Sequence, residues 1–233
     1  MLTKRNSQRE QMDDMELSGE ELHQTLSGLS VINKLLGNTS TTLSEVITEI
    51  IKKNSPLKII DLGCGSGDNL RAIAKWCSTN EKTVELIGID GNQNILDYAR
   101  VQGTSSTHIQ YVQADILADD FLLPECDILI SSHFMYHFSD EAIVDFLRKA
   151  TSQVSTAIIF SELQRSRLAY FLFKLGGPLL PFTQMVKEDG LLAISRSFTR
   201  SELSNLLSRA GIENYKISWR WAFRYLVSVE LMR

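Results

Sequence analysis

Three glycines at alternate positions follow an acidic residue in the stretch Lys58-Ile59-Ile60-Asp61-Leu62-Gly63-Cys64-Gly65-Ser66-Gly67-Asp68. Glycine is needed where the backbone adopts a positive φ or where a ligand approaches it closely. The spacing is G-x-G-x-G, which differs from the G-x-G-x-x-G of dinucleotide-binding turns. The carboxylate of Asp61 would repel a pyrophosphate, whereas it suits a cationic ligand. The motif therefore predicts a binding loop for a small, positively charged molecule.

Two further acidic residues follow apolar stretches that have the pattern of buried strands. The first stretch, Leu86-Ile87-Gly88-Ile89-Asp90, ends in an acid 23 positions after Gly67, and the second, Val112-Gln113-Ala114-Asp115-Ile116, contains Asp115. An acid at the end of the second strand can accept hydrogen bonds from both ribose hydroxyls of a nucleoside. The alternative is that Asp90 is only a turn residue. Three other acids compete with Asp115 for the same role: Asp119, Asp120 and Asp127.

A segment rich in histidine and aromatic residues, Ser132-His133-Phe134-Met135-Tyr136-His137-Phe138, follows the next predicted strand. The pKa of histidine lies near neutral pH, so His137 or His133 could remove a proton from a hydroxyl group. The two histidines are four positions apart and could pair on a metal if the segment were helical. No third ligand has a convincing spacing, and we therefore expect no metal site. The alternative is that these residues only pack against one another.

The composition is that of one globular domain. The chain has 233 residues, of which 43% are hydrophobic and 22% are charged. Its net charge of −4 argues against a broad nucleic-acid interface, which needs clustered positive charge. Its three cysteines imply no disulfide framework, and we find neither a secretory segment nor an apolar run of about 18 residues. We therefore expect a cytoplasmic protein that binds no nucleic acid.

From residue 57 onward, strand patterns alternate with helical stripes. The predicted strands are 57–61, 84–90, 109–114, 127–132 and 157–160. Three pairs that fit capping boxes predict helix starts: Ser18 with Glu21, Thr42 with Glu45, and Thr199 with Glu202. The strand-like runs 215–219 and 225–231 leave no room for a helix between them, which favours an antiparallel hairpin. We predict an α/β fold: a Rossmann-like, doubly wound, seven-stranded sheet, mostly parallel, with that C-terminal hairpin at its edge.

Over about residues 56–162 these motifs, in this order, resemble the class I S-adenosyl-L-methionine (SAM) dependent methyltransferases. The resemblance implies SAM as the cofactor, with the methionine moiety held by Asp61 and the glycine loop. It places the ribose at Asp90 and the adenine at Asp115. The full set of cofactor-binding residues expected on this basis is Asp61, Gly63, Gly65, Gly67, Asp90, Gly91, Asn92, Asp115, Ile116 and Ser132. The motifs are specific for the cofactor but not for the methyl acceptor.

The expected activity is methyl transfer to a small molecule, and we favour an oxygen of a phenolic or polyketide-like acceptor. His137, or else His133, is the candidate base, and Tyr136 is expected to shape the pocket. Arg165 and Arg196 are candidates for binding an anionic group of the acceptor. The alternatives are a quinone or lipid methyltransferase, a non-catalytic SAM-binding protein and a nicotinamide-dependent reductase, although the reductase needs a different glycine pattern.

The chain is expected to form one compact unit. Residues 1–55 would make an N-terminal helical cap on a SAM-binding domain at 56–233, and an apolar insert at about 165–197 would lie over the site. Such an insert suits a lid over an apolar acceptor, a dimer contact or a membrane-surface face. We expect a monomer or a homodimer.

Overall fold

The computed structural model of the protein describes residues 2–53, 56–103, 108–118 and 121–231. Seven strands form one sheet in the order β3-β2-β1-β4-β5-β7-β6. Their bounds are β1 Leu57–Leu62, β2 Val84–Asp90, β3 Ile109–Gln113, β4 Cys126–Ser132, β5 Val154–Leu163, β6 Tyr215–Arg220 and β7 Arg224–Glu230. Strands β1 to β5 pair in parallel, while β7 pairs antiparallel with both β5 and β6. The predicted fold class is confirmed, including the hairpin at the edge.

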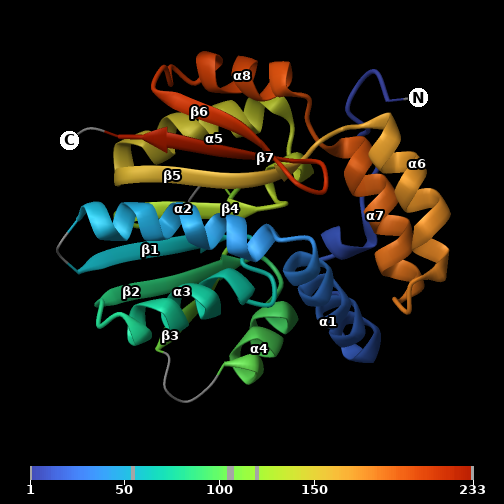
Figure 1. The fold of residues 1–233 in the computed structure, drawn as a ribbon, viewed down its shortest axis with the longest axis horizontal. Helices are drawn as coiled ribbons and strands as arrows, with labels where there is room; N and C mark the ends of the chain where they lie inside the picture. Colours follow the sequence, from blue (N-terminus) through green and yellow to red (C-terminus); the bar gives the residue numbers. More distant parts are fainter. Residues whose placement is uncertain (1, 54–55, 104–107, 119–120, 232–233) are drawn as a thin grey trace.

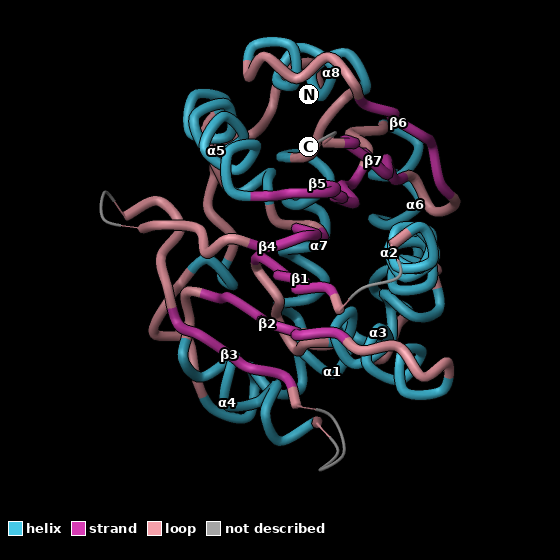
Figure 2. The backbone as a smooth tube through the Cα atoms, turned by 90° about the vertical axis from the view of Figure 1, so that its left-hand side faces the viewer, coloured by secondary structure: helices cyan, strands magenta, loops and turns pink. Residues whose placement is uncertain are grey.

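Helices cover both faces of the sheet, which explains why its central strands are apolar on both sides. On one face, Ile59 and Ile128 pack with residues of three helices: α2 Asn38–Lys52, α3 Asp68–Thr79 and α4 Gln93–Gln102. On the other face, Ile60 and Leu129 pack with residues of α5 Asp140–Gln153 and α8 Arg200–Arg209. Figure 2 shows the sheet between these two layers, with α2 and α3 on one side and α5 on the other.

The remaining helices gather beyond the carboxyl ends of the parallel strands (Figure 1). They are η1 Gln11–Asp13, α1 Gly19–Leu35, η2 Met135–His137, α6 Arg167–Gly176, η3 Gly177–Leu179 and α7 Gln184–Arg196. The order of the strands reverses between β1 and β4, so these elements surround the switch point at which ligands bind in such sheets. No helix in the described part of the chain is long and apolar enough to span a membrane.

The helix starts agree only in part with the capping pairs. Thr199 and Glu202 form the predicted box at the start of α8. Ser18 precedes α1, but its side chain makes no capping hydrogen bond. The predicted start at Thr42 is wrong, because α2 begins at Asn38 directly after Gly37, which has a φ of 78°. Thr42 instead lies fully buried inside the helix, and its packing outweighs the low helix propensity of threonine.

The apolar insert is an antiparallel pair of helices. Phe173 of α6 packs against α7, since a Cβ atom built on Gly190 would lie 2.6 Å from its ring. Helix α7 packs against η1 and η2, near the ends of the strands. Helix α6 therefore lies on the outer side of α7, away from the sheet. The division into a cap at 1–55 and a domain at 56–233 stays a prediction.

Candidate active site

The glycine loop after β1 has the backbone that its sequence predicts. Gly63, Gly65 and Gly67 have φ values of 62°, 51° and 77°, in the region that favours glycine. A Cβ atom on Gly63 would lie 2.2 Å from the ring of Phe134, and one on Gly67 would lie 2.3 Å from the Tyr111 hydroxyl. A Cβ atom on Gly65 would meet nothing within 4 Å. Gly65 is therefore the point at which a ligand can approach the backbone.

Asp61 lies under this loop with its charge unpaired. Its side chain is 1% exposed, and neither carboxylate oxygen has a hydrogen-bond partner. Burial raises the pKa of Asp61 well above its ordinary value, and the nearby carboxylates of Asp90 and Asp68 add to the effect. Asn69 lowers the pKa of Asp61 by less than burial raises it, and the side-chain amide of Asn69 also donates to Ser132 Oγ at 3.2 Å. A buried carboxylate without partners is costly, and a cationic ligand would remove that cost.

Asp90, at the end of β2, faces the same loop. Its two oxygens accept hydrogen bonds from the backbone N–H groups of Gly65 and Asn92, both at 3.1 Å. Burial raises the pKa of Asp90 despite these bonds. The carboxylate still has lone pairs for the hydroxyl groups of a ribose. Asp61, the glycine loop and Asp90 thus form one cradle, and its unpaired acid fits the sulfonium or amino group of SAM.

The other predicted cofactor residues have mixed surroundings. Asn92 is buried, but its side chain caps α4 and donates to the carbonyls of Asp14 and Leu17. Gly91 lies under Met15, whose sulfur is 2.6 Å from the position of a Cβ atom. The Asn92 side chain thus has partners within the protein, and the cofactor-binding role of Gly91 and Asn92 stays a prediction.

The remaining predicted cofactor positions follow β3 and β4. Asp115 is exposed and accepts the N–H of Leu117 at 2.9 Å, and Ile116 packs on the edge of the core. Ser132, at the end of β4, is 3.4 Å from the hydroxyl of Thr42. The adenine role of Asp115 and Ile116 and the role of Ser132 stay predictions. Of the three acids that compete with Asp115, Asp119 and Asp120 lie outside the described residues.

The two candidate bases differ sharply. His133 has a φ of 54°, its Nε2 is buried without a partner, and burial lowers its pKa to about 3. It is therefore uncharged at physiological pH, and its role as the alternative base stays a prediction. His137 lies in η2, where Nδ1 is 2.5 Å from Asp13 Oδ1. Tyr136 stacks on the His137 ring at 4.3 Å between centroids.

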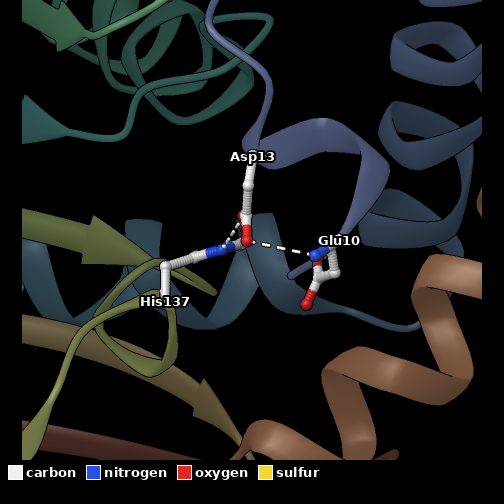
Figure 3. A group of neighbouring side chains, drawn as sticks. All are labelled: Glu10, Asp13 and His137. Atoms are coloured by element: carbon white, nitrogen blue, oxygen red, sulfur yellow. Dashed lines mark hydrogen bonds and ion pairs between the residues drawn. The ribbon is translucent and has the colours of Figure 1, made fainter. Parts of the chain in front are cut away.

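Asp13 reaches His137 from the N-terminal turn η1 (Figure 3). It also accepts a hydrogen bond from Arg196 at 2.6 Å and one from the backbone N–H of Glu10 at 3.1 Å. Burial alone would raise the pKa of Asp13, but the bonds with His137 and Arg196 outweigh it and lower the pKa to about 2. Asp13 is therefore a charged carboxylate that fixes the orientation of the His137 ring. Within the described residues, Nε2 of His137 has no hydrogen-bond partner.

Arg196 and Arg165, the two arginines predicted to bind the acceptor, both have partners within the protein. Arg196 is buried, and besides Asp13 it bonds to Glu10 Oε1 at 3.5 Å and the His137 carbonyl at 3.1 Å. Arg165 is also buried, with Glu202 at 2.5 Å and the Ser197 carbonyl at 2.6 Å. Both guanidinium groups are thus occupied by partners within the protein. These arginines hold α7 and the N-terminal segment in place, while Arg196 also lines an open pocket beside His137. Their role in binding the acceptor stays a prediction.

The ligand atoms of Glu10, Asp13 and His137 lie within 4.8 Å of one another, a spacing that could hold a metal ion. Arg196 already donates to both carboxylates. A metal ion would have to displace this cation or lie beside it, and both are unfavourable. Burial raises the pKa of Glu10 to about 8, which further weakens it as a metal ligand at neutral pH. The group is better described as an ion-pair network around Arg196.

Glu162, at the end of β5, holds the turn that carries His137. Its Oε1 accepts the backbone N–H groups of Phe134 at 3.2 Å and Met135 at 2.9 Å. Its Oε2 is buried without a partner, and burial raises the pKa of Glu162 to about 7. No role was assigned to Glu162 from the sequence. Asp13 was missed altogether, and the only local signal was its spacing from Glu10, with which it forms a capping box.

An open pocket of about 480 Å³ lies beside this turn. Its lining includes Tyr136 and His137 from η2, together with Arg5 and Asp140, which are joined by an ion pair of 2.5 Å. The volume lies within the range of small-molecule sites. Tyr136 is one of the residues that line this pocket, and its role in shaping the acceptor site stays a prediction.

Comparison with known proteins agrees with this geometry. Residues 59–156 match the family described as "Methyltransferase domain". A search of curated proteins found no significant match. The plantazolicin methyltransferase, solved with an acceptor analogue and SAH, has 16% sequence identity and a TM-score of 0.64, with coverage of 91% of this chain and 95% of that one.

Two further solved structures share the fold. Magnesium protoporphyrin IX methyltransferase from Synechocystis, with bound SAH, has 18% identity and a TM-score of 0.57, covering 83% of each chain. An O-methyltransferase family 2 protein from Planctomyces limnophilus, in complex with apigenin, has 18% identity and a TM-score of 0.61. That alignment covers 90% of this chain but 62% of the other. Since the match spans the strands that carry Asp61, Asp90 and Ser132, we conclude that residues 59–156 form a methyltransferase domain.

Proposed function

We propose that the protein transfers the methyl group of SAM to an oxygen of a small phenolic or polyketide-like acceptor, with His137 as the general base. The observation that carries the proposal is the contact of 2.5 Å between His137 Nδ1 and Asp13. A carboxylate on Nδ1 leaves the lone pair on Nε2 and stabilises the imidazolium that forms when Nε2 takes a proton. The pocket of about 480 Å³ beside His137 would hold the acceptor.

Bound SAM supplies an electrophilic methyl group on its sulfonium. Asp61 and the glycine loop would fix the methionine end and Asp90 the ribose. His137 would take the proton of the acceptor hydroxyl on Nε2 as the acceptor oxygen bonds to the methyl carbon. The carbon–sulfur bond of SAM would break at the same time and leave the neutral thioether SAH. The protein contributes mainly orientation, which can supply several kcal/mol when the reacting atoms are held at about 3–3.5 Å.

Two observations bear on the acceptor. The neighbour solved with apigenin is named an O-methyltransferase, which supports oxygen as the methylated atom. A quinone or lipid acceptor is the second candidate, favoured by the exposed apolar side chains of α6.

The test is methyl transfer from SAM to a panel of phenols, carboxylates, quinols and amines, followed as SAH released. With an active phenol, His137→Gln should lower kcat by about a hundredfold, the usual contribution of a general base, and leave SAM affinity unchanged. The matched control is His108→Gln, an exposed histidine at the start of β3. Activity restricted to amines, or an unchanged kcat in His137→Gln, would contradict the proposal.

A further inference from the structure

Helix α6 presents an uncovered apolar stripe. Leu168, Phe171, Leu172 and Leu175 follow the i, i+3, i+4, i+7 spacing of one helix face, and each is more than half exposed. The opposite side of the helix packs on α7 through Ala169 and Phe173. One face of α6 therefore packs against α7, and the other is exposed to solvent.

Two exposed tryptophans lie at the turn of the hairpin β6–β7. Trp219 is 50% exposed and Trp221 is 70% exposed. The indole N–H of Trp219 donates to Gln164 Oε1 at 2.9 Å, and the backbone N–H of Gln164 donates to the Phe223 carbonyl at 2.8 Å. Gln164 precedes α6 by three residues, so Trp219 and the hairpin turn lie near the beginning of that helix. We call the six side chains Leu168, Phe171, Leu172, Leu175, Trp219 and Trp221 the α6–hairpin face.

Helix α6 carries only positive charge, although the chain as a whole has a net charge of −4. Residues 163–187 contain two arginines and two lysines but no acid, and the hairpin contains one lysine and two arginines against one acid, Glu230, at the end of β7 away from the turn. Arg167 and Lys174 on α6 are exposed, and neither forms an ion pair with any described residue. The next acid along the chain, Glu188, bonds to Gln11 on the site side of α7.

We propose that the α6–hairpin face docks on an anionic phospholipid bilayer. Exposed leucine and phenylalanine on one side of a helix, with basic residues at its margins, are the features of interfacial helices. Tryptophan is enriched at the membrane–water interface, and anionic headgroups attract unpaired lysine and arginine. Docking in this way would hold the carboxyl edge of the sheet, where the candidate site lies, close to the bilayer (Figure 1).

A second copy of the chain is a poorer occupant. A symmetric dimer would bring this face against itself, so that Arg167 and Lys174 of both copies would meet without an acid to compensate them. Juxtaposed like charges are unfavourable in an interface. The positive charge that disfavours self-association is the same charge that favours an anionic surface.

Co-sedimentation with vesicles tests the proposal. The protein should sediment with vesicles of phosphatidylcholine that contain about one third phosphatidylglycerol, and much less with phosphatidylcholine alone. Phe171→Glu and Lys174→Glu should each lower the partition coefficient by about tenfold. The matched controls are Val101→Glu, at an exposed apolar site on α4, and Lys75→Glu, at an exposed lysine on α3, and they should bind as the unaltered protein does.

Three results would overturn the proposal. The first is that the unaltered protein does not bind anionic vesicles, and the second is that the α6 variants bind them as well as their controls do. The third is a dimer in analytical ultracentrifugation that Phe171→Glu, but not Val101→Glu, converts to a monomer. Affinity for SAM should be the same in all four variants, which shows that they are folded and separates failure of the docking surface from failure of the proposed function.

Discussion

The three acids of the site differ in the hydrogen-bond and ion-pair partners that the fold provides for their carboxylates. Asp90 accepts backbone N–H groups, Asp13 bonds to a histidine and an arginine, and Asp61 has no partner. An unpaired buried carboxylate marks a position that a ligand completes. Asp13 instead has its full set of partners, which suits a residue that positions His137.

Glu10 makes stability depend on pH in a direction opposite to that of most carboxyl groups. Burial raises its pKa from 4.5 to about 8, so the folded protein binds more protons than the unfolded chain between these values. Stability must then fall as the pH rises from about 4.5 to 8. We expect Glu10→Gln to remove this decline, so that it is more stable than the unaltered protein at pH 8, by at most a few kcal/mol. Urea unfolding at pH 5 and at pH 8 gives the free energy of unfolding of each protein at both values. An equal change in this free energy between the two pH values in Glu10→Gln and in the unaltered protein would contradict the prediction.

Among the residues of the candidate site, the sequence identified those that directly follow predicted strands. It missed those that distant segments of the chain bring to the site. Asp61 and Asp90 could be found because a strand, an acid and a turn are contiguous in the chain. Asp13 is separated from His137 by more than a hundred residues, and only the folded chain brings them together. The same long-range packing explains why Arg165 and Arg196 proved to be internal ion-pair partners.

Among the elements, the N-terminal turn η1 and the glycine loop are the two that complete the site. Asp189 of α7 accepts the backbone N–H groups of Gln11 and Met12, both at 3.0 Å. This contact keeps η1 over the end of β4. The glycine loop was predictable because positive φ leaves a mark in the sequence, whereas η1 is short and has none of the periodicity that identifies a helix.

Gly65 and Gly211 offer a matched pair for testing the loop. Both have positive φ and both have open space where a Cβ atom would be. Alanine should therefore cost each about 1 kcal/mol of stability through backbone strain. Only Gly65→Ala places a methyl group where the ligand approaches, and we expect it to weaken SAM binding by about tenfold, while Gly211→Ala leaves it unchanged. Calorimetric titration with SAM decides, and equal affinities in the two variants would show that the loop does not contact the cofactor.

For the whole molecule, strand and helix patterns along residues 57–231 were enough to predict the fold class, because the alternation of elements restricts the topology. The start of α2 could not be predicted in this way, because buried contacts of Thr42, and not its helix propensity, determine where the helix begins. From the sequence, a membrane-surface face was only one of three possible roles of the apolar insert, beside a lid over the acceptor and a dimer contact. Its position on the far side of α7 follows from tertiary packing, in which Phe173 fits against Gly190.

The central claim is that the unpaired carboxylate of Asp61 binds the cationic cofactor, and calorimetric titration of SAM into Asp61→Asn tests it most directly. We expect the affinity to fall by about tenfold to a hundredfold, the value of a charged hydrogen bond. Without ligand, the variant should be at least as stable at neutral pH, because a group whose folded pKa is raised destabilises the protein as pH rises. Asp145→Asn, at an exposed acid on α5, is the control. An affinity for SAM that is the same in Asp61→Asn as in Asp145→Asn would contradict the account.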